Sequence, residues 1–446
     1  MQIHYAAKRN DRDAVHHQLA RGIDINARDE NSGATPLIWA AGSAIADVAM
    51  LEYLLQQGAD ANAISSQLQF TALMEAVRSG SKDKVLYLLQ NGADPHFRNK
   101  DGYNALIQGC PPQLEITKLL LEYGANPDQS SLSNESALSV ASRVCDWDTV
   151  RVLIAHGADP RPLQWTPLLH AIVMGSDDDI RTELNDLSSM VASDQWERSP
   201  WLLSVCTGDV SRAEFLLKAG GDVSDTGRCG TTSLQCAVLS KSCDMLSWIL
   251  SLGVDPNMTD DFGNTALMEA VQEDSVECAK ILIANGAGVR ACNSTHSQAI
   301  NQWRLSLHMA ELLVSAGADI NYTDGGDLAL KNAAETGDAI LVQGLLRLGA
   351  HVDTASTGET ALLAAVAEDA LDVIRVLLEA GADPNAQDVD REGALWHVRT
   401  LEATQMLLDA GADLNLTDAY KRKASEVQCD DEIRAAIVQR MQSQGC

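Results

Sequence analysis

The sequence predicts an all-α solenoid of about 13 two-helix units, capped at both ends. The phrase "TALMEAV" occurs twice, at Thr71–Val77 and at Thr265–Val271, and the two starts lie 194 residues apart. Related phrases divide that distance into six steps of 30 to 33 residues. Each unit closes on a glycine marker such as "GADAN" at Gly58. This repetition favours stacked modules over the roughly three globular domains that a chain of 446 residues would otherwise suggest.

A short apolar run that follows a capping residue marks the first helix of a unit. Thr, Ser or Asn can accept a hydrogen bond from a free amide in the first helical turn, and Pro suits the next position. The leucine that comes next anchors the helix in the core. The nine capping residues are Thr35, Thr71, Asn104, Ser136, Thr166, Ser199, Thr232, Thr265 and Thr360.

A second helix, with a Leu-Leu pair near its end as at Leu88 and Leu89, leads to the closing glycine. Glycine ends the helix because it can enter the left-handed region that a β-carbon disfavours, and the Asp, Pro or Asn that follow build a tight projecting turn. The closing glycines are Gly22, Gly58, Gly92, Gly124, Gly157, Gly220, Gly253, Gly286, Gly317, Gly349, Gly381 and Gly411.

The two linked markers resemble the ankyrin repeat, a helix–turn–helix pair with a β-turn finger near 33 residues long. The resemblance covers essentially the whole chain, although the histidine that usually follows the leucine is absent throughout. It implies an ankyrin-repeat solenoid that binds proteins on a concave surface of finger tips and first helices.

The pattern is irregular between residues 175 and 198, where no glycine closes the second helix. Two interpretations stay open: a loosely defined repeat within one continuous solenoid, or a kink. We therefore expect N-terminal repeats, the first of them a cap, over residues 1–187, and C-terminal repeats with a cap over residues 188–446. The units at 291–315 and 388–410 are compressed, and we expect a shortened turn between their paired helices.

The net charge of −29 and the pI near 4.5 argue against a nucleic-acid or anionic-membrane surface. They favour a basic protein partner, or solubility alone. The sequence shows no signal-peptide core and no membrane-length apolar stretch, and its ten cysteines form no CxxC pair. We expect reduced thiols, a cytoplasmic location and a monomer.

No catalytic motif is present, and neither a cofactor nor a metal is expected. Cys229, Cys236 and Cys243 are spaced by seven, but in the repeat register they fall in a finger, on a first helix and at the start of a second helix. His170 and His397 occupy matching positions of distant repeats and cannot share a site. An enzyme is therefore not favoured.

Mapping the register onto the sequence predicts which residues contact a partner. Aromatic side chains among polar neighbours are typical of interface hot spots, although a finger aromatic can also pack on the next finger. The predicted partner-binding residues are Arg98, Lys100, Asp101, Tyr103, Leu132, Glu135, Trp165, Trp196, Arg198, Asp261, Phe262, Asn264, Gln272 and Glu273.

Three functions follow as hypotheses. The first is a non-enzymatic module that binds, and inhibits, a basic protein, as a toxin-neutralising immunity protein does. The second is an intracellular scaffold or host-directed effector that links two partners. The third is an enzyme with an unrecognised site, which would need a deep pocket with converging polar groups.

Overall fold

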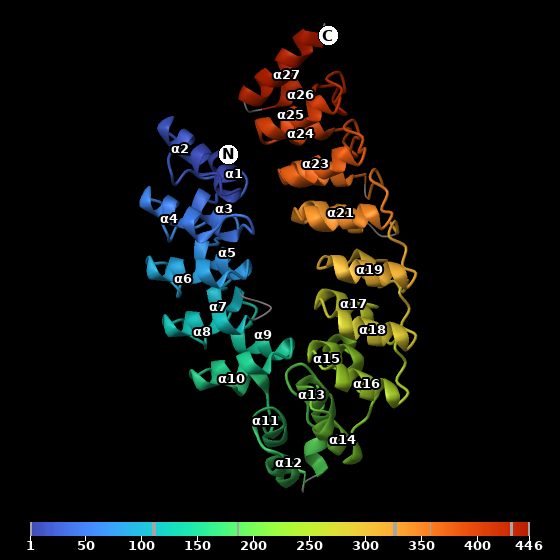
Figure 1. The fold of residues 1–446 in the computed structure, drawn as a ribbon. Helices are drawn as coiled ribbons and strands as arrows, with labels where there is room; N and C mark the ends of the chain where they lie inside the picture. The colour runs from blue at the N-terminus through green and yellow to red at the C-terminus, as the bar shows by residue number, and fades with distance from the viewer. Residues whose placement is uncertain are drawn as a thin grey trace. The chain divides into compact units, whose positions relative to one another are not determined.

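A computed structural model describes residues 2–108, 113–184, 187–323, 328–356, 358–428 and 431–444. These residues form short helices joined by turns, and within the described ranges there is no β-strand, only isolated bridges (Figure 1). This confirms the prediction of an all-α repeat protein. No helix of the described residues has the length and apolarity that crossing a membrane requires.

The N-terminal helices run as far as residue 218. They are α1 (Gln2–Lys8), α2 (Arg12–Ala20), α3 (Pro36–Gly42), α4 (Val48–Gln56), α5 (Ala72–Arg78), α6 (Lys82–Gln90), α7 (Ala105–Gln108), α8 (Leu114–Glu122), α9 (Ala137–Arg143), α10 (Trp147–Ala155), η1 (Arg161–Leu163), α11 (Pro167–Met174), α12 (Asp177–Glu183), η2 (Leu187–Val191), α13 (Pro200–Thr207) and α14 (Val210–Lys218).

The remaining helices continue the same alternation. They are η3 (Arg228–Gly230), α15 (Ser233–Leu239), α16 (Cys243–Ser251), α17 (Ala266–Gln272), α18 (Val276–Ala284), η4 (Ala299–Asn301), α19 (Leu307–Ser315), α20 (Ala329–Thr336), α21 (Ala339–Arg347), α22 (Ala361–Ala367), α23 (Leu371–Glu379), α24 (Ala394–His397), α25 (Leu401–Asp409), α26 (Ala424–Val427) and α27 (Asp431–Gln444).

The capping residues act as the sequence predicts. In all nine phrases the side-chain oxygen of the capping residue accepts a hydrogen bond from the backbone amide three residues later, at 2.8 to 3.5 Å. The twin phrases have the same geometry: Thr71 accepts from Met74, and Thr265 from Met268, both at 3.3 Å. A cap of this kind satisfies an amide that the helix leaves free, which starts each first helix at a fixed residue.

The closing glycines also adopt the predicted conformation, because all twelve have φ between 85° and 117°. The turns that follow are joined from one repeat to the next by asparagine. Asn62, for example, donates to the carbonyl of Gly92 at 2.9 Å and accepts from the amide of Asp94 at 2.8 Å. The same pair of bonds is made by Asn26, Asn257, Asn321 and Asn385.

The core of each repeat lies between its own helices and those of its neighbours. First helices pack on first helices, as α3 does on α1 and α5, and second helices on second helices, as α6 does on α4 and α8. Ala40 and Ala41 on α3 are fully buried, as are Leu54 on α4 and Leu88 on α6. Small residues on the first helices let the layers approach closely, and leucines on the second helices fill the space between them.

Contacts group the chain into two compact units. One holds residues 1–207 and 211–221, and the other holds residues 208–210 and 222–446. The predicted division at 187/188 falls within the first of these, and whether the irregular repeat is a hinge stays a prediction. In that repeat α12 begins at a capping box formed by Ser176 and Asp179. Three aspartates lie in its first turn, at the positive end of the helix dipole.

The two compressed units differ from the expectation in where they are shortened. We expected a shorter turn between the paired helices, but the first helix itself is short: η4 has three residues and α24 has four, against seven in α17. As a result, α19 begins eight residues after η4 begins (307 − 299), whereas α18 begins ten residues after α17 begins (276 − 266). The turn prediction was therefore wrong, because periodicity fixes the length of a unit but not the element that loses residues.

Candidate protein-binding surface

Backbone hydrogen bonds join several finger tips to the next tip along the chain. The carbonyl of Asp101 accepts from the amide of Leu132 at 2.8 Å, and the carbonyl of Cys229 accepts from Asp261 at 2.9 Å. The carbonyl of Phe262 accepts from Ser294 at 2.8 Å. These bonds use the main chain and leave the side chains of the tips in solvent.

Five of the predicted residues are exposed and make no side-chain hydrogen bond or ion pair to the described part of the chain: Lys100, Asp101, Leu132, Asp261 and Phe262. Leu132 and Phe262 are 78% and 55% exposed, which is unusual for large apolar side chains. Each is flanked by a charged residue of its own or the preceding finger. These five residues, which we call the free tip residues, are available to a partner.

Six other predicted residues are held by contacts within the chain. Arg98 donates to the carbonyls of Gly102 and Ser130 at 3.3 and 2.6 Å, and the Tyr103 hydroxyl donates to Glu135 at 2.5 Å. Glu135 also pairs with Arg143 at 3.1 Å. The rest of the group are Asn264, bonded to Asp260 and Asn293, Gln272, bonded to Gln302, and Glu273, which pairs with Lys241. These residues join neighbouring repeats.

The two tryptophans that the sequence singled out are half-buried. The Trp165 ring lies 6.5 Å from that of Trp147 and 6.1 Å from that of His170, and its indole N–H is buried without a hydrogen-bond acceptor among the described residues. The Trp196 ring lies beneath the Arg143 guanidinium at 5.7 Å. Both rings therefore pack against side chains of their own unit.

The prediction that Arg198 contacts a partner is wrong, because the residue lies in the interior with 4% of its side chain exposed. It pairs with Asp194 at 2.6 Å, donates to the carbonyl and hydroxyl of Ser142 at 2.8 and 2.9 Å, and lies over the Trp147 ring. A buried guanidinium with every partner supplied by its own chain cannot contact another protein directly. Arg198 is a structural residue of the irregular repeat.

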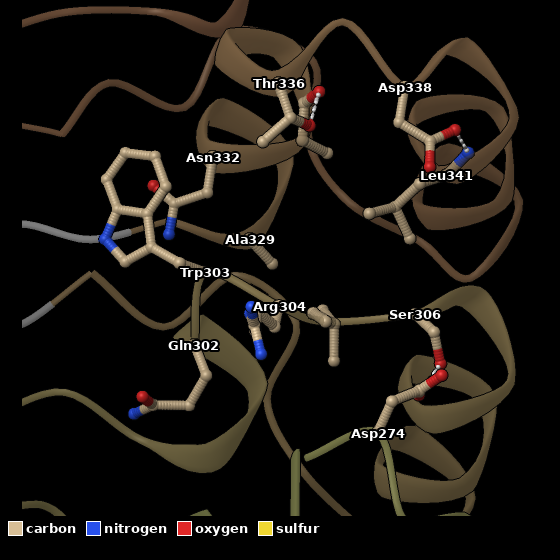
Figure 2. A pocket seen from close by; sticks show the side chains of 12 residues that line it. Asp274, Gln302, Trp303, Arg304, Ser306, Ala329, Asn332, Thr336, Asp338 and Leu341 are labelled. Atoms are coloured by element: carbon tan, nitrogen blue, oxygen red, sulfur yellow. Dashed lines mark hydrogen bonds between the residues drawn. The ribbon is translucent and has the colours of Figure 1, made fainter. Parts of the chain in front are cut away.

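The sequence did not predict a cavity, yet the structure has one at each compressed unit. The larger, of about 330 Å³, lies between the loop after η4 and helix α20, and is lined by Trp303, Arg304 and Asn332 among others (Figure 2). The smaller, of about 240 Å³, lies between α22 and α24. Because a missing helical turn removes side chains that would fill the layer, the shortened first helix is the signal that could have revealed both.

The smaller cavity adjoins a group that could hold a metal ion. The ligating atoms of Asp388, Glu392 and His397 lie within 4.8 Å of one another, and His397 Nε2 is 3.6 Å from each carboxylate. All three side chains are partly exposed. Asp388 also accepts the amides of Asp390 and Glu392, which is the turn-forming role of its position in other fingers.

Glu269, in the second twin phrase, is an acid whose environment strongly favours the protonated form. Burial raises its pKa to about 7, and the nearby carboxylates of Glu273 and Asp260 add to the effect. Its counterpart Glu75 instead pairs with Arg78 at 2.6 Å. One sequence phrase thus holds a glutamate in two different electrostatic settings.

Comparisons with known proteins find ankyrin repeats along most of the chain. The profile of ankyrin repeats (three copies) matches residues 3–99, 105–184, 201–293, 243–324 and 297–388. The ankyrin repeat and KH domain-containing protein mask-1 of Caenorhabditis elegans is 30% identical over 408 residues, which are 85% of this chain and 15% of that protein. A putative ankyrin repeat protein of fowlpox virus, FPV031, is 30% identical over 158 residues, 34% of this chain and 46% of that protein.

Among solved structures, the human ASB11 ankyrin repeat domain is 24% identical, with a TM-score of 0.43, and the match covers 48% of this chain and 99% of that domain. The chain spans less than half the length of the two relatives named above. Ankyrin repeats are generally protein-binding modules without enzymatic activity of their own. The repeat profile, the caps and the glycine turns agree, and the chain belongs to the ankyrin repeat family.

Proposed function

We propose that this chain binds, and inhibits, a basic protein through its fingers and first helices, in the manner of an immunity protein that neutralises a toxin. The observation that carries the proposal is the set of free tip residues. Leu132 and Phe262 expose apolar surface at finger tips of a chain whose net charge is −29. Apolar anchors inside a negative field suit a cationic partner, because the field speeds the encounter and the anchors slow dissociation.

Affinity capture with the full chain tests the proposal. Capture at roughly 50 mM salt should retain a basic protein that is released at roughly 500 mM, since the Debye length falls well below 10 Å over this range. The captured protein, once purified, should lose at least about tenfold in affinity for Leu132→Ser or Phe262→Ser. If it is an enzyme, its activity should fall in proportion to the bound fraction.

Ile340 provides a matched control. It is 73% exposed on the second helix α21, away from the finger tips, so Ile340→Ser should leave binding unchanged. Binding that ignores salt, or that both tip variants retain, would contradict the proposal.

A scaffold that links two partners is the second candidate, because each compact unit carries its own exposed apolar tip: Leu132 in the first and Phe262 in the second. Under that function Leu132→Ser should release one partner and Phe262→Ser another. If Leu132→Ser and Phe262→Ser both release the same single partner, the inhibitor function is favoured over the scaffold.

A further inference from the structure

The larger cavity lies in the second compact unit and owes its existence to the missing part of a first helix. After η4 the chain runs directly through residues 302–306 into α19, while the next layer, α20, keeps a full first helix of eight residues. Trp303 and Arg304 stand in that linking segment, and Asn332 faces them from α20 (Figure 2). The opening, of about 330 Å³, is large enough for one long side chain of another protein.

The strongest indication that the cavity binds a ligand is the buried side-chain oxygen of Asn332. The residue is 4% exposed, its Nδ2 donates to the carbonyl of Asn301 at 3.0 Å, and its Oδ1 accepts no hydrogen bond from the described residues. A buried acceptor without a hydrogen-bond donor raises the free energy of a protein, so a ligand that brings an N–H group to an acceptor unpaired among the described residues recovers that loss.

The wall opposite supplies an aromatic face and a cation. Trp303 is 55% exposed, so its indole offers a flat surface to anything that enters. Arg304 is exposed and forms no hydrogen bond or ion pair to the described residues, so its guanidinium is free to donate. Two carboxylates, Asp274 and Asp338, also line the cavity, each with one oxygen bound to a neighbour within the chain.

These groups discriminate between charge classes. The lining carries both signs of charge: Arg304 repels a cationic side chain that Asp274 and Asp338 attract, and the two aspartates repel a carboxylate that Arg304 attracts. A carboxylate also brings no donor to the Asn332 oxygen. A neutral planar group that both donates and accepts meets no such conflict. A primary carboxamide has two N–H donors and one acceptor oxygen in one plane.

We infer that this cavity is a recognition pocket for an asparagine or glutamine side chain of the protein partner, an inference that rests on the proposed function. The carboxamide N–H donates to Asn332 Oδ1, its oxygen accepts from Arg304, and its flat face and stem lie against the Trp303 indole. The pocket thereby adds a salt-insensitive, sequence-selective contact to a surface whose long-range attraction is electrostatic.

The pocket is tested with the full chain labelled with ¹⁵N at tryptophan, and Trp303→Phe assigns the Trp303 indole signal. The probes are blocked tripeptides, acetyl-Gly-X-Gly-amide, in which X is Gln, Glu, Arg or Leu. We expect the Gln probe to shift the Trp303 signal with an affinity at least tenfold higher than the other three. Equal responses to Gln and Leu would reduce the cavity to a non-selective apolar contact and overturn the inference.

Substitutions test separately how much each wall of the cavity contributes to binding of the Gln probe. Arg304→Ala and Asn332→Leu should each weaken the Gln probe about tenfold, while Lys280→Ala, an exposed cation on α18, should not change it. Because Asn332 also binds the Asn301 carbonyl, Arg304→Ala, which retains the Trp303 signal, keeps the test informative if Asn332→Leu fails to fold. Unchanged binding of the Gln probe by Arg304→Ala contradicts the inference.

The captured partner distinguishes failure of this inference from failure of the proposed function. A partner whose binding weakens with Leu132→Ser or Phe262→Ser but not with Trp303→Ala leaves the proposed function standing and removes the pocket from it. A small carboxamide metabolite that is released from the denatured protein and identified by mass spectrometry would replace the partner side chain as occupant and overturn the assignment.

Discussion

Arg198 Nη2 lies 2.6 Å from Asp194 Oδ2, with 4% and 0% of the two side chains exposed. The pair is further bonded to Ser142 and packed on Trp147, so it joins α9, α10 and the irregular repeat inside the first unit. We expect Arg198→Ala to destabilise the chain by about 3 to 5 kcal/mol, because it strands a buried carboxylate. Denaturant unfolding monitored by circular dichroism measures the loss.

Glu269→Gln should stabilise the chain at neutral and alkaline pH. The pKa of Glu269 is about 7 in the folded state against 4.5 for the ordinary side chain, so the folded state binds the proton more tightly. Its contribution is present below pH 4.5 and is lost as pH rises through 7, which at full loss amounts to about 3 kcal/mol. Unfolding of both proteins at pH 5 and pH 8 should show a gain from the substitution that grows with pH.

Glu75→Gln is the matched control, because the same seven-residue phrase surrounds it and its carboxylate pairs with Arg78. Removing that charge breaks an ion pair and should bring no gain between pH 5 and pH 8. An equal gain in both variants would show that general relief of the acidic charge, and not burial of Glu269, is responsible.

Asn62→Ala should cost about 1 kcal/mol, because its side chain makes both bonds that tie one closing turn to the next. Hydrogen exchange should reveal faster exchange of the Asp94 amide, which loses its acceptor. Asn31 makes no side-chain hydrogen bond to the described residues and is exposed, so Asn31→Ala should change stability by less than about 0.5 kcal/mol.

Gly102→Ala should destabilise the first unit more than Gly58→Ala does. Both glycines have positive φ, 84° and 90°, so each substitution carries a backbone cost of about 1 to 2 kcal/mol. A β-carbon at Gly102 would also lie 3.0 Å from the backbone nitrogen of Leu132, whereas one at Gly58 meets nothing within 4 Å. Thermal unfolding compares the two, and an equal loss would mean that the fingers separate freely at this point.

The local part of the fold could be predicted from the sequence because its causes are local. A threonine caps the amide three residues away, as Thr71 does for Met74. A glycine such as Gly58 adopts positive φ because it has no β-carbon, whatever its tertiary contacts. Both signals recur with the repeat and reinforce one another. The fold class followed from them without knowledge of any tertiary contact.

The state of the candidate site could not be predicted in the same way, because it depends on partners one repeat or more away. Arg98 is held by Ser130, and Tyr103 by Glu135, each about a repeat further along the chain. Arg198 reaches back to Ser142, 56 residues earlier. Register can place a residue on a finger, but only the packed structure shows whether its polar atoms are already satisfied.

The asparagine bridges also bear on how such a chain changes length over evolutionary time. Asn62 and its counterparts each contact the turn of the following repeat through the same two atoms, so duplication or loss of one complete module leaves an equivalent turn in place. Insertion of a few residues between a bridge and its turn would set the side chain against the wrong carbonyl. Growth and shrinkage by complete modules is therefore the route that preserves these joints.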